Sequence, residues 1–488
     1  MSGAGGVRRA LLSGLVAAVS FVLAQQPCES FSIVTLEDLQ AARKCPVITG
    51  SVRISYRAPD VNLDGVVAIH GNLTTWCTSP TSATGSTRCI MNNFLETISS
   101  TTLTTVGGSL EFSSSINLSN VSFPQLATVK GLFSLTDLNS LTYLDITRLE
   151  SAGKIVMKAD NLQTLKHETL RKITGWGLDN SRHIYIATGS LKSVDSFFQQ
   201  PLEVDLVEVN SVYVKRLNYG FTKTTTLSID ASGPNPNITL VFGGPSIREV
   251  VVEAIHASFG LWSLERLPSL ERLSAGSLRF YNNRCKRLDL PFNQLGALIV
   301  HHNSDLEWLS IPPKAKDWTD FSFYIYGSPL LNLTSEYAVD EKGEAVRFWY
   351  WPQSDIRYIS IDANLTNDFF NSLLFDHQST SANTTKRRVA ETFLARSKTL
   401  DCTPFKTLSD QGILPSGKDF TCSDSYSSLE DGGSSGNSSD SSSGNSSDSS
   451  SGNSPDGSSE KSLGSWNGVN HWACLAWVTV CAQGIFLL

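Results

Sequence analysis

The sequence of 488 residues has no block of basic residues: 39 Lys and Arg stand against 46 Asp and Glu, for a formal net charge of −7. Proteins that bind nucleic acid usually carry a clustered positive patch. There is no phosphate-binding loop and no G-x-S-x-G nucleophile elbow, because GGPSI at residues 243–247 lacks the final glycine. The sequence therefore gives no support for a nucleic-acid partner, for nucleotide chemistry or for a serine hydrolase.

Paired carboxylates are also scarce. Glycoside hydrolysis usually needs two of them, about 5–9.5 Å apart. The expected strands offer isolated acids at Glu111, Asp230 and Asp362, and the acidic cluster DEKGE at 340–344 is typical of a solvated turn. We therefore expect no catalytic residues and no enzymatic activity.

Metal ligands are missing at the usual spacings. His301 and His302 are adjacent in VHHNSD, but no second His or Cys follows at ligand spacing. We expect this pair in a surface turn, and we expect no metal and no cofactor.

The first residues have the pattern of a secretory signal. Arg8 and Arg9 precede an apolar run at 10–23, and Val-Leu-Ala at 22–24 is typical of a cleavage site. We predict that residues 1–24 are removed. A signal anchor is the alternative, but the run is short and no basic flank follows it.

The last residues have the three-part pattern of a glycosylphosphatidylinositol (GPI) anchor signal. Small residues at 456–459 precede a polar spacer at 460–471 and a terminal apolar run without basic residues after it. We predict lipid attachment at Gly457, with Asp456 as second choice, and removal of residues 458–488.

The segment 423–457 contains an eight-residue Ser/Gly/Asn/Asp repeat without apolar side chains. Such a segment cannot bury enough surface to offset its conformational entropy, which predicts a disordered stalk. Its serines suit O-glycosylation.

Seven of the nine cysteines precede the predicted anchor signal. Pairing of sequence neighbours in an oxidising compartment predicts three disulfides, although sequence alone does not fix connectivity. They are Cys28–Cys45, Cys77–Cys89 and Cys402–Cys422. Cys285 is left over, and we expect a buried thiol there.

Seven Asn-X-Ser/Thr sequons in the expected folded part predict N-glycosylation. They begin at Asn72, Asn117, Asn120, Asn237, Asn332, Asn364 and Asn383.

An internal repeat gives the main information on the fold. FPQLATVKGLFSL at 123–135 and LPSLERLSAGSLRF at 267–280 share one plan, in which proline and leucine precede a glycine and an alternating strand. Gly108, Gly131 and Gly153 follow at steps of 23 and 22 residues. A period of 20–29 residues with one short strand per unit is typical of a solenoid, whose stacked coils share one core. The glycine fits either a positive φ or a close backbone passage.

We therefore predict a mainly β fold, a right-handed parallel β-solenoid of leucine-rich character over residues 25–422. A helix in SIVTLEDLQAARKC at 32–45 is expected to close its N-terminal end, with Thr35 as N-cap and Asp38 completing a capping box.

Four consecutive aromatic residues occur at 348–351 in RFWYWPQ. Alternation along a strand places two inward and two outward. They are expected to seal the C-terminal end of the solenoid. As an alternative hypothesis, Trp349 and Trp351 contact carbohydrate.

The coils CPVITGSVRIS, VGGSLEFS, FPQLATVKGLFSL and LPSLERLSAGSLRF resemble those of receptor L-domain-like proteins. The plan from signal peptide to anchor signal is similar to that of the fungal GPI-anchored proteins of cell-wall organisation and sporulation. The resemblance implies a non-enzymatic protein that supports wall integrity. It also implies two lobes, with a junction near residues 191–245, where the repeat is poorly followed.

The expected function is thus a non-catalytic, GPI-anchored surface glycoprotein that contributes to cell-wall organisation. Its expected partners are wall polysaccharides or wall proteins, and the membrane through the lipid. Its expected place is extracellular, on the outer leaflet of the plasma membrane or in the wall. The alternatives are a glycan-remodelling enzyme and a ligand-binding receptor or adhesin.

Overall fold

The computed structural model describes residues 28–424 except 56, 58, 76–93, 169, 199, 212, 231–236, 341 and 376–387. Several predictions lie outside these residues. They are the signal peptide, the Cys77–Cys89 pair, the sequon at Asn383, nearly all of the stalk, and the anchor signal with Gly457 and Asp456.

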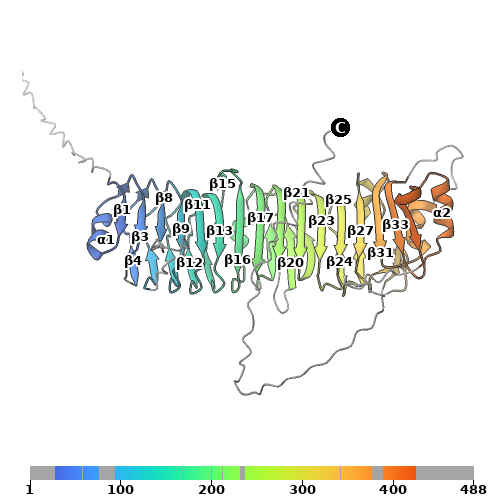
Figure 1. Cartoon of the computed structure of the whole chain (residues 1–488), viewed down its shortest axis with the longest axis horizontal. Coiled ribbons are helices and arrows are strands. Elements are labelled where there is room, and N and C mark those ends of the chain that lie inside the picture. Colours follow the sequence, from blue (N-terminus) through green and yellow to red (C-terminus); the bar gives the residue numbers. More distant parts are fainter. Residues whose placement is uncertain are drawn as a thin grey trace, which may run out of the picture. The chain divides into compact units, whose positions relative to one another are not determined.

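Short parallel strands stack into a β-solenoid of about 15 turns, which confirms the mainly β solenoid prediction. One row of strands, here called the long row, continues from the first described coil to the last (Figure 1). Its members are β1 (Phe31–Ile33), β3 (Val52–Ile54), β6 (Leu73–Thr75), β9 (Leu110–Ser113), β11 (Thr128–Thr136), β13 (Ser151–Lys158), β16 (His183–Thr188), β17 (Glu203–Ser211), β19 (Lys223–Asp230), β21 (Glu249–Ser258), β23 (Arg272–Tyr281), β25 (Gln294–His301), β27 (Ser322–Tyr326), β31 (Ile356–Asp362), β33 (Val389–Arg396) and β34 (Phe420–Ser423).

Shorter parallel sheets form a second row on another side of the coils. Its members are β4 (Asp60–Asn62), β7 (Thr97–Ser99), β10 (Asn120–Ser122), β12 (Tyr143–Asp145), β14 (Thr164–Lys166), β18 (Arg216–Tyr219), β20 (Asn237–Phe242), β22 (Leu261–Arg266), β24 (Arg287–Asp289), β26 (Trp308–Ser310), β28 (Asn332–Leu333) and β32 (Asn364–Leu365).

The remaining elements are few. Four short strands extend the N-terminal half of the long sheet: β2 (Val47–Ile48), β5 (Ala68–Ile69), β8 (Thr105–Val106) and β15 (Lys172–Ile173). An antiparallel hairpin joins β29 (Tyr337–Val339) and β30 (Ala345–Arg347). The helical elements are α1 (Leu36–Arg43), α2 (Thr403–Asp410), η1 (Asp195–Phe198), η2 (Pro313–Asp317), η3 (Asn367–Phe370), η4 (Asn371–Phe375) and η6 (Gly417–Asp419).

The core lies between the rows and is built by strict alternation along each strand. In β23, Leu278 and Phe280 are fully buried while Arg279 between them points outward. Leu278 lies in register with Ile255 and Leu298 of the neighbouring coils. Each coil therefore adds apolar side chains to one continuous interior, which a single coil alone does not enclose.

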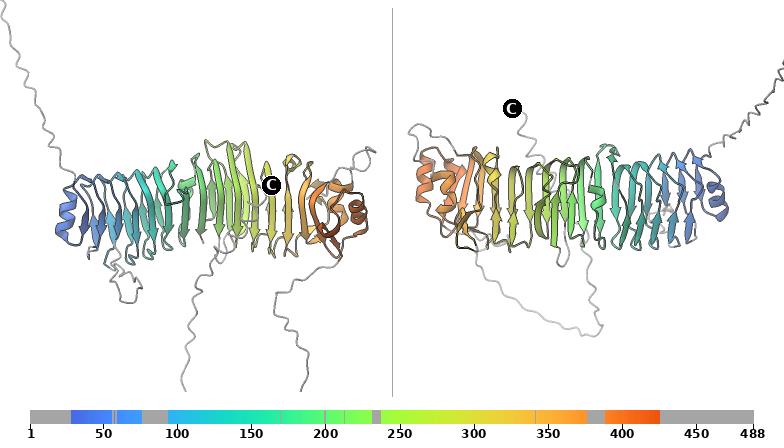
Figure 2. Two further views of the ribbon diagram at one scale, coloured as in Figure 1. Left: turned by 45° about the horizontal axis from the view of Figure 1, so that its top comes forward. Right: turned by 180° about the vertical axis from the view of Figure 1, so that it is seen from behind.

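The long row runs without a break through the region where the resemblance places a junction between lobes. β16 pairs with β17, β17 with β19, and β19 with β21, all in parallel. Figure 2 shows the same uninterrupted succession of strands from two further sides.

The repeated glycines stack at one corner of the coils. The amide of Gly131 donates to the carbonyl of Gly108 at 2.9 Å. A Cβ on Gly131 would lie 2.8 Å from that carbonyl, and a Cβ on Gly153 would lie 2.6 Å from the Gly131 carbonyl. Neither Gly131 nor Gly153 has a positive φ. Close backbone passage, rather than a left-handed conformation, is the reason for glycine here.

We predict that Gly131→Ala lowers the free energy of unfolding by about 2–3 kcal/mol, because the obstructing atoms are backbone and cannot rotate away. Gly412→Ala is the control: Gly412 has a φ of 73° and nothing within 4 Å of the added methyl group. It should cost only about 1 kcal/mol of left-handed strain. If urea unfolding showed the same decrease in the free energy of unfolding for both variants, the close-passage explanation would be contradicted.

Helix α1 begins with the predicted capping box. Thr35 Oγ1 accepts from the amide of Asp38 at 3.2 Å, and the Asp38 carboxylate accepts from the amide of Thr35 at 2.9 Å. The helix begins at Leu36, directly after the predicted N-cap Thr35, whereas Ile33 belongs to β1 and pairs with Ile54.

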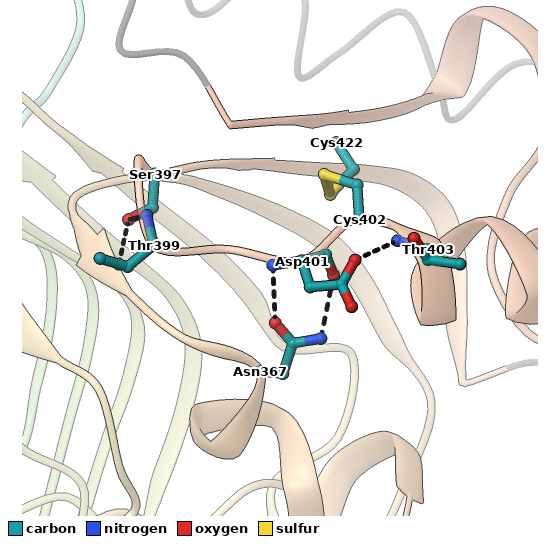
Figure 3. The surroundings of a disulfide bond; sticks show 7 residues. All are labelled: Asn367, Ser397, Thr399, Asp401, Cys402, Thr403 and Cys422. Atoms are coloured by element: carbon teal, nitrogen blue, oxygen red, sulfur yellow. Dashed lines mark hydrogen bonds between the residues drawn. A yellow bond between two sulfur atoms is a disulfide. The ribbon is translucent and has the colours of Figure 1, made fainter.

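Two of the three predicted disulfides are present among the described residues. Cys28–Cys45 joins the segment before β1 to the residue after α1, and Cys402–Cys422 joins the start of α2 to β34. Beside the second bond, Asn367 and Asp401 exchange two hydrogen bonds of 2.9 and 3.0 Å (Figure 3). These bonds tie α2 to the preceding coil.

Candidate functional site

The outer face of the long row carries a cluster of aromatic and basic side chains on β21, β23, β25 and β27. We call it the Arg279 surface, and its members are His256, Arg279, Tyr281, His301, Tyr324 and Tyr326. Their inward neighbours are core residues, so alternation directs these six outward. Strand register sets His256 beside Arg279, and sets His301 between Tyr281 and Tyr326.

The rings of Tyr281, His301 and Tyr326 contact one another in sequence along this line: the first pair is stacked and the second is tilted by 36°. The Tyr281 and His301 rings lie 5.7 Å apart and nearly parallel, at 11°, and the His301 and Tyr326 rings lie 5.0 Å apart. His302 meets all three rings edge-on. The spacing follows from neighbouring parallel strands, which lie about 4.8 Å apart.

The histidine prediction was therefore correct for one residue and wrong for the other. His302 is exposed in a turn with a φ of 53°, whereas His301 is the last residue of β25 and is partly buried by the stacked tyrosines. Burial, and then the charge of His302, lowers the pKa of His301. No group of three candidate metal ligands occurs in the part of the chain that the structure describes.

Arg279 carries a charge without a partner. Its side chain forms no ion pair and no hydrogen bond with the described residues, and its Nε is shielded from solvent. Burial lowers its pKa. His256 lies beside Arg279 on the neighbouring strand β21. Burial, and then the charge of Arg279, lowers the pKa of His256 to about 4, so His256 is neutral at pH 7. The guanidinium is thus a partly desolvated cation, and its register partners on the two neighbouring strands are His256 and Ile299.

Most of the sequons lie away from the Arg279 surface. Asn120, Asn237, Asn332 and Asn364 are all in strands of the second row, and Asn117 precedes the first of them. Asn72 lies at the corner before β6. Glycans at these positions would leave the outer face of the long row from β9 to β34 uncovered within the described residues. Asn332 and Asn364 are register partners, so glycans on both would be close neighbours.

The carbohydrate hypothesis for Trp349 and Trp351 was wrong. Both are buried, with exposed fractions of 0% and 4%. They lie against Phe323, Phe369 and each other, with ring centroids 4.7–6.0 Å apart. Burial does alternate along residues 348–351, with the two tryptophans inward and Phe348 partly exposed, but the predicted strand was wrong, because these residues follow the end of β30 at Arg347. A buried ring has no face for a sugar.

A groove of about 380 Å³ lies beside the β29–β30 hairpin. Its walls include Trp308, Phe348, Val339 and Arg287. The Trp308 ring already has Phe348 at 4.1 Å and the Arg287 guanidinium at 5.0 Å. Because protein groups already contact this ring, the groove is a weaker candidate for ring stacking than the Arg279 surface.

The three acids lie on different coils, and Asp230 has other carboxylates nearby, because burial and then the charges of Glu208, Asp160 and Asp230 raise the pKa of Tyr185. Glu111 and Asp230 point outward from different coils, β9 and β19. Asp362 is 4% exposed, and burial raises its pKa while the charge of Arg396 opposes that shift. In the cluster at 340–344, Asp340 accepts from the amides of Lys342 and Glu344, which confirms a turn.

One polar groove does bring two carboxylates together, and sequence reasoning missed it. Glu150 and Glu168 line it with Arg148 and Arg171, in a volume of about 380 Å³. Glu150 lies 3.8 Å from Arg171, and both partners are more than half exposed. These residues belong to the connections that precede β13 and β15. The strands lie on neighbouring coils, and the sequence did not show how those coils align.

Cys285 is a free, buried cysteine, as predicted. Burial raises the pKa of its thiol to about 11, so little of the reactive thiolate forms at pH 8. We predict that iodoacetamide leaves Cys285 unmodified in the native protein and alkylates it in guanidinium chloride, as read from the mass of its peptide. Modification of the native protein at the rate of a free thiol would contradict this burial.

No helix in the described segments has both the length and the apolar character to cross a membrane. Comparisons of this chain with protein-family models, with curated proteins and with solved structures found no match.

Proposed function

We propose that this protein is a non-catalytic, GPI-anchored surface glycoprotein that contributes to fungal cell-wall organisation and integrity. The observation that supports this best is the solenoid of about 15 turns, with its long row of parallel strands. Solenoids provide extended surfaces for large ligands. Its disulfides suit an oxidising extracellular environment. In this proposal the long row faces wall polysaccharides or wall proteins.

The finer features of the fold belong to the same proposal. We infer coils of the leucine-rich, receptor L-domain-like type, with α1 and Cys28–Cys45 closing the N-terminal end. Leu39 and Ala42 of α1 are buried in the common core, which supports this role. Ser423, the predicted first residue of the stalk, still belongs to β34, so the segment 424–457 would then be a flexible stalk that holds the solenoid away from the membrane.

Anchoring is tested by treating cells that express the full chain with phosphatidylinositol-specific phospholipase C. We expect release of the protein, and we expect a chain ending at Gly457 to be secreted without treatment. Wall digestion with β-glucanase separates a wall-bound pool from a membrane pool. Retention after both treatments, or an uncleaved C-terminus in mass spectrometry, would overturn the anchor proposal.

A glycan-remodelling enzyme is the second candidate, supported by the polar groove that holds Glu150 and Glu168. Two carboxylates in one groove are the usual requirement for glycoside hydrolysis. If this candidate is correct, Glu150→Gln and Glu168→Gln each abolish a glycan-cleaving activity of the wild-type protein.

A further inference from the structure

We propose that the Arg279 surface is a binding site for an anionic polysaccharide, in which Arg279 pairs with a carboxylate or phosphate of the glycan. This inference rests on the proposed function, because it names the class of glycan that a surface protein of this kind would contact.

Arg279 has a charge that none of the described residues pairs with, which favours an anionic ligand. Its side chain has no carboxylate partner among the described residues, and its Nε is buried without an acceptor. A desolvated charge is unfavourable until it gains a counter-charge. The guanidinium fork matches carboxylate and phosphate oxygens, which it can bind through two parallel hydrogen bonds. His256 beside it is a neutral imidazole and provides no negatively charged oxygen for the guanidinium.

A partly exposed tyrosine ring lies next to this charge. Arg279 and Tyr281 are two residues apart on β23, so their side chains stand roughly 6.6 Å apart on the same face. Tyr281 is 46% exposed. His301 covers one side of its ring, while its register partner on the other side is Ser258, a small residue. A sugar whose acidic group contacts Arg279 therefore has an exposed tyrosine ring within reach.

The shape and accessibility of this face suit a long glycan. Parallel strands in register form a regular surface, and the line of rings Tyr281, His301 and Tyr326 continues across three coils. Such a surface suits a long chain of repeating units better than a compact ligand. The sequons of the second row leave this face uncovered, as described above.

The test uses full-length glycosylated protein in detergent and three immobilised probes at fixed ionic strength. They are polygalacturonate, which carries carboxylates, a phosphomannan, and neutral β-1,3-glucan. We expect at least one anionic probe to bind about tenfold more tightly than the neutral glucan, which corresponds to about 1.4 kcal/mol. Which anionic probe binds better identifies the acidic group.

Variants then locate the site. Arg279→Gln should weaken binding of the anionic probe about tenfold, and Tyr281→Ala should weaken it severalfold. Arg272→Gln is the matched control on the same strand; Arg272 is exposed and lies 3.5 Å from Glu249, and its replacement should leave binding unchanged. Because Arg279 has no partner to lose, Arg279→Gln should also leave the melting temperature unchanged or raise it. If that variant fails to fold, Tyr281→Ala alone decides.

Equal binding of the neutral and anionic probes, or wild-type affinity of both Arg279→Gln and Tyr281→Ala, would overturn the inference. So would failure to bind any of the three probes. None of these results affects release by phospholipase C, so failure of this site is distinguishable from failure of the anchor proposal.

Discussion

Replacing Trp349 with alanine is expected to lower the free energy of unfolding by about 3–5 kcal/mol. Trp349 is fully buried and its ring lies 4.7 Å from Phe369, 5.1 Å from Phe323 and 5.3 Å from Trp351. Removing the indole leaves a cavity that three rigid rings cannot fill. The cost is therefore the lost burial plus the unfilled space.

A solenoid can open locally, so hydrogen exchange should accompany urea unfolding for this variant. Protection should fall first in β27 and η3, whose residues Phe323 and Phe369 contact the Trp349 ring. Phe348→Ala is the control, since Phe348 is partly exposed. If Trp349→Ala lowered the free energy of unfolding no more than Phe348→Ala does, Trp349 would not be buried as the structure shows.

The second large effect is expected for Glu336→Ala, also about 3–5 kcal/mol. Glu336 is 2% exposed, and its carboxylate accepts from Arg347 Nη2 at 2.5 Å and from the amide and hydroxyl of Ser372 at 2.9 and 2.7 Å. Without this carboxylate, Arg347 becomes a largely buried cation with no counter-charge. Breaking a buried pair on one side is far more costly than removing both partners.

A double-mutant cycle tests this explanation. Glu336→Ala combined with Arg347→Met should be less destabilising than the sum of the single changes. The control is Glu307→Ala, which breaks an ion pair with Lys286 whose side chains are 52% and 75% exposed. That change should cost less than about 1 kcal/mol. Additive effects at Glu336 and Arg347 would contradict a coupled buried pair.

The solenoid was predictable because its cause is repeated in the sequence. Glycine recurs at positions where backbones of neighbouring coils pass closely, and its spacing indicates the period of the repeat. Apolar residues alternate with polar ones in each coil, and this alternation indicates the strands. The capping box of α1 and the disulfides Cys28–Cys45 and Cys402–Cys422 are local features with short sequence separations. Local interactions of this kind can be predicted from the sequence even when the register between coils is unknown.

Features that depend on register were not predictable. Alternation showed that two of the residues 348–351 face inward, but only packing against Phe323 and Phe369 selects the tryptophans. The Arg279 surface combines residues from four successive strands of the long row, and the connections between coils differ in length. The hydrogen bond from Leu132 to Ser109 spans 23 residues, whereas that from Ser109 to Asn72 spans 37. The sequence did not show which side chains of neighbouring coils would meet.

The measurement that tests the account most directly is incubation of the purified glycosylated protein with β-glucan, chitin and mannan oligosaccharides, followed by chromatography of the products. The proposed non-catalytic function predicts that every oligosaccharide is recovered unchanged, even at high protein concentration and long incubation. New or redistributed oligosaccharides, lost again in Glu150→Gln or Glu168→Gln, would contradict it and would identify the polar groove as an active site.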